Sequence, residues 1–205
     1  MGWKYWRQPS LQEEVKPHIN ADIPICYEDM YEVGNPDAHV NRRIYALKHG
    51  STQEAQNETL RAAGSICELL QGIDEPFVLT WVPSSTAYDD PEGDERLKGI
   101  AMAVAERLPA CRAVETILNT VSRDKLHETP GLRFPAKVAE HWKQANVDIR
   151  GVSRVYVLDD VVTSGASMAG AFRIMRWMVS PWTLVTGLAL TVAVKSRNIE
   201  MLRHA

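Results

Sequence analysis

The chain of 205 residues is poor in cysteine and has no long apolar run. Its three cysteines, Cys26, Cys67 and Cys111, are widely separated and form no CxxC motif, so the sequence suggests neither a zinc site nor a disulfide framework. We expect reduced thiols in a cytoplasmic protein. The longest apolar run, 184–194, is too short to span a membrane, and the first seven residues lack the apolar core of a signal peptide.

Excess charge of one sign is also absent. Lysine and arginine number 23 against 26 aspartate and glutamate residues, which gives a formal net charge of -3. The sequence has no basic stretch, and this argues against nucleic acid as a partner, although it leaves a local basic patch open. A chain of this length predicts one domain with a substantial hydrophobic core.

The most informative stretch is 154–178. Four apolar residues, 155–158, indicate a strand buried on both faces, and two carboxylates, Asp159 and Asp160, follow it. Small and hydroxyl-bearing residues then form a turn: Thr163, Ser164, Gly165, Ala166 and Ser167. Beyond the turn, apolar residues recur at helical spacing at positions 171, 174, 175 and 178. The order is therefore buried strand, acidic pair, small loop and helix.

This order predicts a binding site for a phosphorylated sugar. In open parallel sheets, ligands bind beyond the carboxyl ends of the strands. A helix start offers unpaired N–H groups and a positive dipole end, which suit a phosphate. Gly165 allows close approach of the backbone, while Asp159 and Asp160 suit sugar hydroxyls or a divalent cation. The implied ligand carries a sugar diol beside a phosphate and brings Mg²⁺; the alternative is an ordinary strand with an acidic turn.

Residues 155–167 resemble the phosphoribosyl pyrophosphate (PRPP) motif of type I phosphoribosyltransferases. The shared pattern is four apolar, two acidic and two apolar residues, then a loop rich in threonine, serine and glycine; Tyr156 departs from the usual aliphatic residue. The resemblance implies that Asp159 and Asp160 hold the ribose hydroxyls and contact Mg²⁺. It also implies that residues 163–167 cradle the 5′-phosphate.

Two further loops fit the resemblance. A predicted strand at 77–82 ends in Pro83, Ser84 and Ser85, where the family binds pyrophosphate; an ordinary turn is the alternative. The long polar segment 119–135 occupies the slot of a flexible loop that closes over the pyrophosphate.

Basic residues of that long segment are the candidates for catalysis. The resemblance implies that Arg123 and Lys125 neutralise the departing pyrophosphate; the alternative is that they are surface residues on a linker. Arg96 and Lys98, near the start of another predicted helix, could also point at the site. The acidic segment 89–95 before them indicates a solvated loop, and we assign no ligand there.

The fold expected from these elements is α/β, with a mostly parallel central sheet flanked by helices, as in type I phosphoribosyltransferases. Strands are predicted near 43–48, 77–82, 114–118, 154–158 and 184–194, and helices at 51–71, from 96 and at 135–142. Thr52 is the expected cap of the first helix, whose predicted buried face is Leu60, Ala63, Cys67 and Leu70. Residues 1–40 are expected to form an arm or hood-like segment, and 41–205 the phosphoribosyltransferase domain.

The implied reaction transfers ribose 5-phosphate from PRPP to a nitrogen nucleophile, such as a nucleobase, and releases pyrophosphate. Thr163 stands where enzymes for 6-oxopurines carry an acidic residue, so the resemblance disfavours hypoxanthine and guanine. The segment 46–50 and the Val-Pro at the end of the second strand resemble the ComF-like branch, although its cysteine-rich zinc module is absent. We expect a homodimer with no membrane contact. Two alternatives stay open: a non-catalytic PRPP- or nucleotide-sensing protein, and a nucleic-acid-associated protein.

Overall fold

A mostly parallel sheet forms the centre of the molecule. The computed structural model describes residues 4–6, 24–91, 93–122 and 135–195. Its six-stranded sheet has the order β1-β2-β8-β7-β3-β4. The strands are β1 (Lys4–Trp6), β2 (Ile25–Val33), β3 (Phe77–Trp81), β4 (Cys111–Ala113), β7 (Arg154–Val162) and β8 (Leu184–Lys195). The strands from β2 to β4 are parallel, and β1 is antiparallel to β2, so the predicted α/β sheet is confirmed.

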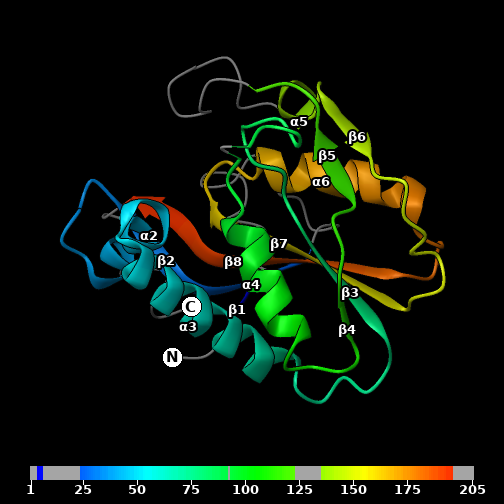
Figure 1. Ribbon diagram of the computed structural model, residues 1–205, viewed down its shortest axis with the longest axis horizontal. Coiled ribbons are helices and arrows are strands. Elements are labelled where there is room, and N and C mark those ends of the chain that lie inside the picture. The colour runs from blue at the N-terminus through cyan, green and yellow to red at the C-terminus, as the bar shows by residue number, and fades with distance from the viewer. Residues whose placement is uncertain (1–3, 7–23, 92, 123–134, 196–205) are drawn as a thin grey trace.

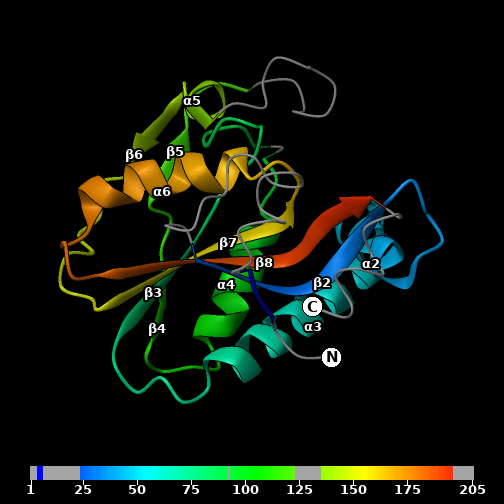
Figure 2. The ribbon, with the colours of Figure 1, turned by 180° about the vertical axis from the view of Figure 1, so that it is seen from behind.

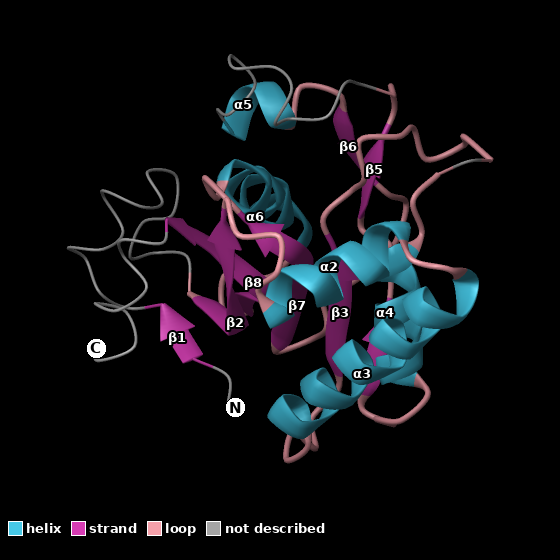
Figure 3. Cartoon of the chain, turned by 90° about the vertical axis from the view of Figure 1, so that its left-hand side faces the viewer, coloured by secondary structure: helices cyan, strands magenta, loops and turns pink. Residues whose placement is uncertain are grey.

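Helices cover both faces of this sheet. One face carries α2 (His39–His49), α3 (Thr52–Leu70) and α4 (Arg96–Ala105), and the other carries α6 (Ala166–Met178) (Figures 1 and 3). The short helix α5 (Pro135–Val138) packs on α6. Beside them, β5 (Ile117–Asn119) and β6 (Trp142–Gln144) form a separate antiparallel pair, which Figure 2 shows from behind.

The alternation of side chains along β7 builds two cores. Val155 and Val157 belong to the core beneath α6, which includes Met168. Tyr156 and Leu158 belong to the core beneath α3 and α4 on the opposite face. Successive residues of a strand point to opposite faces, so an unbroken apolar run is what a strand between two helical layers needs.

Two glycines allow α6 to lie close to its neighbours. A Cβ atom on Gly187 of β8 would lie 3.0 Å from Ile25 Cγ1 and 3.1 Å from Met168 Sδ. A Cβ atom on Gly170 of α6 would lie 3.3 Å from both Ala139 Cβ and Trp142 Cζ3. All four distances are below ordinary van der Waals contact, so the missing side chains set how closely α6 approaches the sheet and the segment around α5.

The strand predicted near 43–48 is wrong, because these residues lie in α2. Their buried members, Ile44 and Leu47, are three residues apart, which is a helical spacing and not an alternation. The missing parallel strand is β2, which pairs with β8 along its whole length. The segment 1–40, expected as an arm or hood, therefore contributes a strand to the same sheet as residues 41–205.

Four local expectations also need correction. The strand predicted at 114–118 overlaps only β5, at 117–118, because β4 ends before it at Ala113 and the two strands belong to different sheets. The cap of α3 is Ser51 and not Thr52, since Ser51 forms a capping box with Glu54. Leu60 is 51% exposed, so the buried face of α3 is made by Ala62, Ala63, Ile66 and Leu70. The helix predicted at 135–142 ends at Val138, and Trp142 begins β6.

Candidate functional site

The neighbouring strands β3 and β7 form a switch point at the carboxyl edge of the sheet. From β7 the chain passes through α6 to β8, and from β3 it passes through α4 to β4, on the opposite face. The two strands pair in register up to Trp81 and Leu158. In open α/β sheets, ligands bind in the crevice where connections diverge in this way. The candidate loops, residues 82–95 and 163–165, leave the sheet here.

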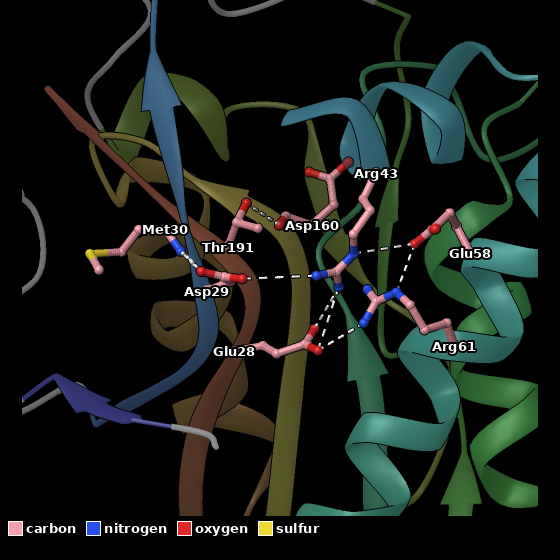
Figure 4. Close-up of polar contacts among 8 residues, drawn as sticks. All are labelled: Glu28, Asp29, Met30, Arg43, Glu58, Arg61, Asp160 and Thr191. Atoms are coloured by element: carbon pink, nitrogen blue, oxygen red, sulfur yellow. Dashed lines mark hydrogen bonds and ion pairs between the residues drawn. The ribbon is translucent and has the colours of Figure 1, made fainter. Parts of the chain in front are cut away.

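The acidic pair lies inside the extended end of β7. This strand continues to Val162, beyond the predicted end at 158, and pairs there with β8. Asp160 follows Tyr156 and Leu158 on the face of α2 and α4, where its Oδ2 lies 2.9 Å from Lys48 Nζ and 3.5 Å from Arg96 Nη1. The Asp160 carbonyl accepts a hydrogen bond from Thr191 Oγ1 at 3.1 Å (Figure 4). Asp160 is therefore fixed by neighbours on three other elements.

Asp159 precedes Asp160 on β7, so its side chain points to the opposite face of the sheet and has a different electrostatic environment from that of Asp160. Its Oδ1 accepts a hydrogen bond from the Asp160 N–H at 2.9 Å. Burial, and then the negative charge of Asp160, raise the pKa of Asp159 to about 8, while Lys48 acts in the opposite direction. Without ligand, burial and the charge of Asp160 thus favour the protonated form of Asp159. A cation or a set of hydroxyl donors would release that proton by favouring the carboxylate.

The small loop joins β7 to α6 as the sequence predicts. Gly165 is the N-cap of α6 and has φ of 82°, a left-handed conformation that glycine adopts without strain. The first turn of α6 begins when Ala169 N–H donates to the Gly165 carbonyl at 2.9 Å. The amides before Ala169 have no carbonyl acceptor within the helix, which is the arrangement that binds phosphate at helix starts. Residues 163–167 are thus beside the acidic pair.

The loop after β3 is held against the end of β7. Val82 N–H donates to the Leu158 carbonyl at 2.9 Å, and Pro83, which follows it, is buried. Ser84 Oγ accepts from Thr86 N–H at 3.2 Å, which closes a tight turn. This contact with β7 brings Pro83, Ser84 and Ser85 to the same edge as the acidic pair.

Asn119 holds this loop from the other side. Its Nδ2 lies 3.1 Å from the carbonyl oxygens of Ser84, Ser85 and Thr86. Asn119 is at the end of β5 and is only 2% exposed. Asn119 is not among the residues predicted from the sequence, because a lone asparagine more than thirty positions from its partners carries no local signal.

Two basic side chains meet the acidic pair, one expected and one missed. Arg96 Nε donates to Asp94 Oδ1 at 2.6 Å, and Arg96 also lies beside Asp160. Burial alone would lower the pKa of Arg96, but Asp94 and Asp160 raise it above its ordinary value. Burial would raise the pKa of Asp94, but its contact with Arg96 lowers it. Lys48, which pairs with Asp160, was not predicted from the sequence. Lys98, which was a candidate, pairs with the exposed Glu95 and not with the acidic pair.

An ion-pair network fixes the helix that carries Lys48. Arg43 of α2 lies 3.4 Å from Glu28 of β2 and 3.5 Å from Glu58 of α3 (Figure 4). Arg61 of α3 lies 2.8 Å from the same Glu28 and 2.7 Å from Glu58. The side chains of Arg43 and Glu28 are 14% and 11% exposed, so losing one partner would leave a poorly solvated charge. The network ties α2 and α3 to β2 and so positions Lys48.

Arg123 and Lys125, the candidate catalytic residues, lie outside the described residues.

Two open hollows, of about 530 and 420 Å³, lie at the opposite edge of the sheet, near the amino ends of β3 and β4. None of the candidate residues lines either hollow. The candidate site at the carboxyl edge is therefore defined by its loops and charged side chains and not by either of these hollows.

The donors at the carboxyl edge fit one mode of magnesium binding. Within the described ranges, no group of three or more His, Cys, Asp or Glu side chains is arranged to hold a metal ion. Mg²⁺ often binds to one or two carboxylates together with substrate phosphates and water, and Asp159 and Asp160 suit that mode.

In the part of the chain that the structure describes, we find no helix with the length and apolar character needed to cross a bilayer.

Comparison with known proteins gives one finding of note. No family model matches the chain, and no curated protein matches it. Among solved structures, the chain is similar to a "purine phosphoribosyltransferase from Pyrococcus horikoshii Ot3" with 13% sequence identity and a TM-score of 0.32. The match covers 67% of this chain and 87% of that chain. A TM-score this low carries no argument about function, which depends instead on the geometry described above.

Proposed function

We propose that this protein binds PRPP at the switch point between β3 and β7 and transfers its ribose 5-phosphate to a nitrogen nucleophile, with release of pyrophosphate. The observation that carries the proposal is the sequence of elements at the end of β7. Two carboxylates, a loop with a left-handed glycine and the open start of α6 follow one another there. This order places acceptors for a sugar diol directly beside donors for a phosphate.

Each part of PRPP has a counterpart in this arrangement. Residues 163–167 and the first amides of α6 would bind the 5′-phosphate. Asp159 and Asp160 would accept hydrogen bonds from the ribose hydroxyls. The loop with Pro83, Ser84 and Ser85 lies across the crevice from them and would bind the pyrophosphate.

Positive charge for the pyrophosphate is available from two sides of the crevice. Lys48 and Arg96 meet at Asp160 from different helices. Arg96 Nη1 is buried and forms no hydrogen bond among the described residues, so a donor remains for a ligand oxygen. We further propose that Arg123 and Lys125 approach the pyrophosphate from the segment after β5. Magnesium, when bound, would balance the charge of the pyrophosphate.

The protein residues have two tasks as the bond to pyrophosphate breaks. The sugar becomes positively charged in an oxocarbenium-like transition state, and the carboxylates of Asp159 and Asp160 lie where they would stabilise it. The leaving group gains negative charge, which Lys48 and Arg96 would stabilise after exchanging Asp160 for pyrophosphate oxygens. A nucleobase nitrogen or a related amine is the acceptor class that this reaction requires.

The decisive experiment incubates the protein with PRPP, Mg²⁺ and a panel of nucleobases and measures released pyrophosphate. We expect base-dependent release by the wild-type protein and none by the variant that combines Asp159→Asn with Asp160→Asn. The matched control combines Asp37→Asn with Asp74→Asn, two exposed carboxylates outside the candidate loops. PRPP binding by calorimetry without release would favour the non-catalytic sensing alternative. Absence of both binding and release would contradict the proposal.

A further inference from the structure

The buried amide of Asn119 makes an unusual set of contacts. Its Nδ2 lies 3.1 Å from three consecutive backbone carbonyl oxygens, those of Ser84, Ser85 and Thr86. Carbonyl oxygens accept hydrogen bonds from the NH₂ group and not from Oδ1, and the two N–H donors are shared among these three acceptors, so the partners fix the orientation of the amide. The Asn119 backbone carbonyl also accepts a hydrogen bond from Tyr88 N–H at 2.8 Å. One residue of β5 therefore holds the loop after β3 at four points.

The other end of this amide is left without a partner. Asn119 Oδ1 is buried and makes no hydrogen bond to any described residue. Burying an unsatisfied carbonyl oxygen opposes folding. A side chain that only filled space at the end of β5 could be apolar at no such cost. The contacts of Nδ2 are thus the feature that distinguishes an asparagine from an apolar residue at this position.

The contacts of Asn119 also determine where the loop amides point. Within one planar peptide unit, the C=O and the following N–H point in opposite directions. Because the carbonyls of residues 84–86 converge on Asn119, the N–H groups of residues 85–87 are directed away from it. Thr86 N–H bonds to Ser84 Oγ at 3.2 Å and Ala87 N–H to Ser122 Oγ at 2.9 Å. Ser85 N–H has no hydrogen-bond partner within the described ranges.

We propose that Asn119 is a positioning residue for the pyrophosphate subsite, which it prepares by holding three carbonyls of the 84–86 loop inward and so directing the loop amides outward. Thr86 N–H and Ala87 N–H already donate to serine hydroxyls, so Ser85 N–H is the outward donor left for an anion, whereas an outward carbonyl would repel it. The identity of the anion rests on the proposed function, since the same loop is the proposed site for the pyrophosphate of PRPP. Asn119 itself acts only through the loop.

The test compares Asn119→Ala and the equally sized Asn119→Asp with the wild-type protein. The control is Thr120→Ala, which removes the hydrogen bond from the neighbouring Thr120 Oγ1 to the His141 carbonyl and leaves the 84–86 loop untouched. Amide hydrogen exchange across residues 84–88 reports the loop conformation. Calorimetry reports the affinity for pyrophosphate with Mg²⁺, and separately for ribose 5-phosphate, whose proposed contacts are the acidic pair and the loop at the start of α6 and not the 84–86 loop.

Both Asn119 variants should exchange the loop amides faster and bind pyrophosphate at least about 10-fold more weakly, as expected when a preorganised binding loop is released. Affinity for ribose 5-phosphate should stay within about twofold of wild type, since the phosphate of that ligand binds at the start of α6 and not at the 84–86 loop. Mild acid should restore pyrophosphate binding to Asn119→Asp relative to Asn119→Ala, because protonation returns an O–H donor. Thr120→Ala should match wild type in every measurement.

Two results would overturn the inference and are distinguishable from failure of the proposed function. Unchanged exchange at residues 84–88, or unchanged pyrophosphate affinity, in a folded Asn119→Asp variant would remove the positioning role alone. An equal loss of affinity for pyrophosphate and ribose 5-phosphate would show general damage and would also refute it. A wild-type protein that binds neither compound would contradict the proposed function and, with it, the pyrophosphate subsite.

Discussion

Replacing Asp159 with asparagine should stabilise the ligand-free protein at neutral and alkaline pH. Burial and the charge of Asp160 raise the pKa of Asp159 from 3.8 to about 8. Below pH 3.8 the carboxyl is neutral in both the folded and the unfolded states. Between the two values, the folded protein holds a proton that the unfolded chain has lost, so the free energy of unfolding falls as pH rises. Above the folded pKa, the loss is complete.

The size of this effect follows from the shift. At about 1.4 kcal/mol for each pH unit, a rise from 3.8 to about 8 sets an upper limit of roughly 6 kcal/mol. Asp159 is not fully buried, so solvent screening reduces this value. We expect Asp159→Asn to be more stable than wild type by about 1–3 kcal/mol near pH 8, with the difference disappearing toward pH 4.

Urea denaturation of both proteins at intervals from pH 4 to pH 9 measures this difference. Asp37→Asn is the control, because it makes the same change at an exposed carboxylate. A constant difference between wild type and Asp159→Asn over this range would refute the reasoning. A variant less stable than wild type at pH 9 would also refute it, because the carboxylate would then be stabilised by Lys48 more than it is destabilised by burial.

Three further outcomes test the site and its support. Lys48→Met should weaken pyrophosphate binding by about 10-fold in calorimetry through loss of one charged contact, whereas Lys98→Met should not; equal effects would contradict the assignment of Lys48. Gly187→Val should lower the free energy of urea unfolding by about 1–3 kcal/mol through overpacking, and Gly72→Val, at a position with open space, should cost much less. Arg123→Ala should slow turnover by about 10²-fold, with little change in PRPP affinity; full turnover would leave this residue without a catalytic role.

The end of β7 was predictable because its signal is contiguous. An apolar run, two acidic residues, a small loop and a helical period follow one another within 25 positions, residues 154–178, and each constrains the next. The structure differs from this prediction only in the end of the strand, which lies at Val162 and not at 158. The extension comes from pairing with β8, a partner thirty positions away, which no local pattern reports.

The strand β2 was missed because its charges hide the pattern of a strand. Glu28, Asp29 and Glu32 interrupt the apolar residues at its start. In the folded protein, Arg43 and Arg61 from α2 and α3 neutralise Glu28, and the Asn41 side chain bonds to both the N–H and the carbonyl of Glu32. An acidic strand is thus tolerated inside the sheet only because two later helices supply its partners, and that is tertiary information.

The pairing of charges at the carboxyl edge narrows the kind of ligand that fits there. Lys48 lies against Asp160, and Arg96 lies between Asp94 and Asp160, so both cations already have carboxylate partners. A simple anion would have to separate these pairs and leave the carboxylates without compensation, which is costly when they are partly buried. A ligand that offers an anion to the cations and, at the same time, hydroxyl groups or a bound metal ion to the carboxylates replaces every contact it breaks. PRPP with Mg²⁺ has both features, whereas inorganic phosphate has only the first.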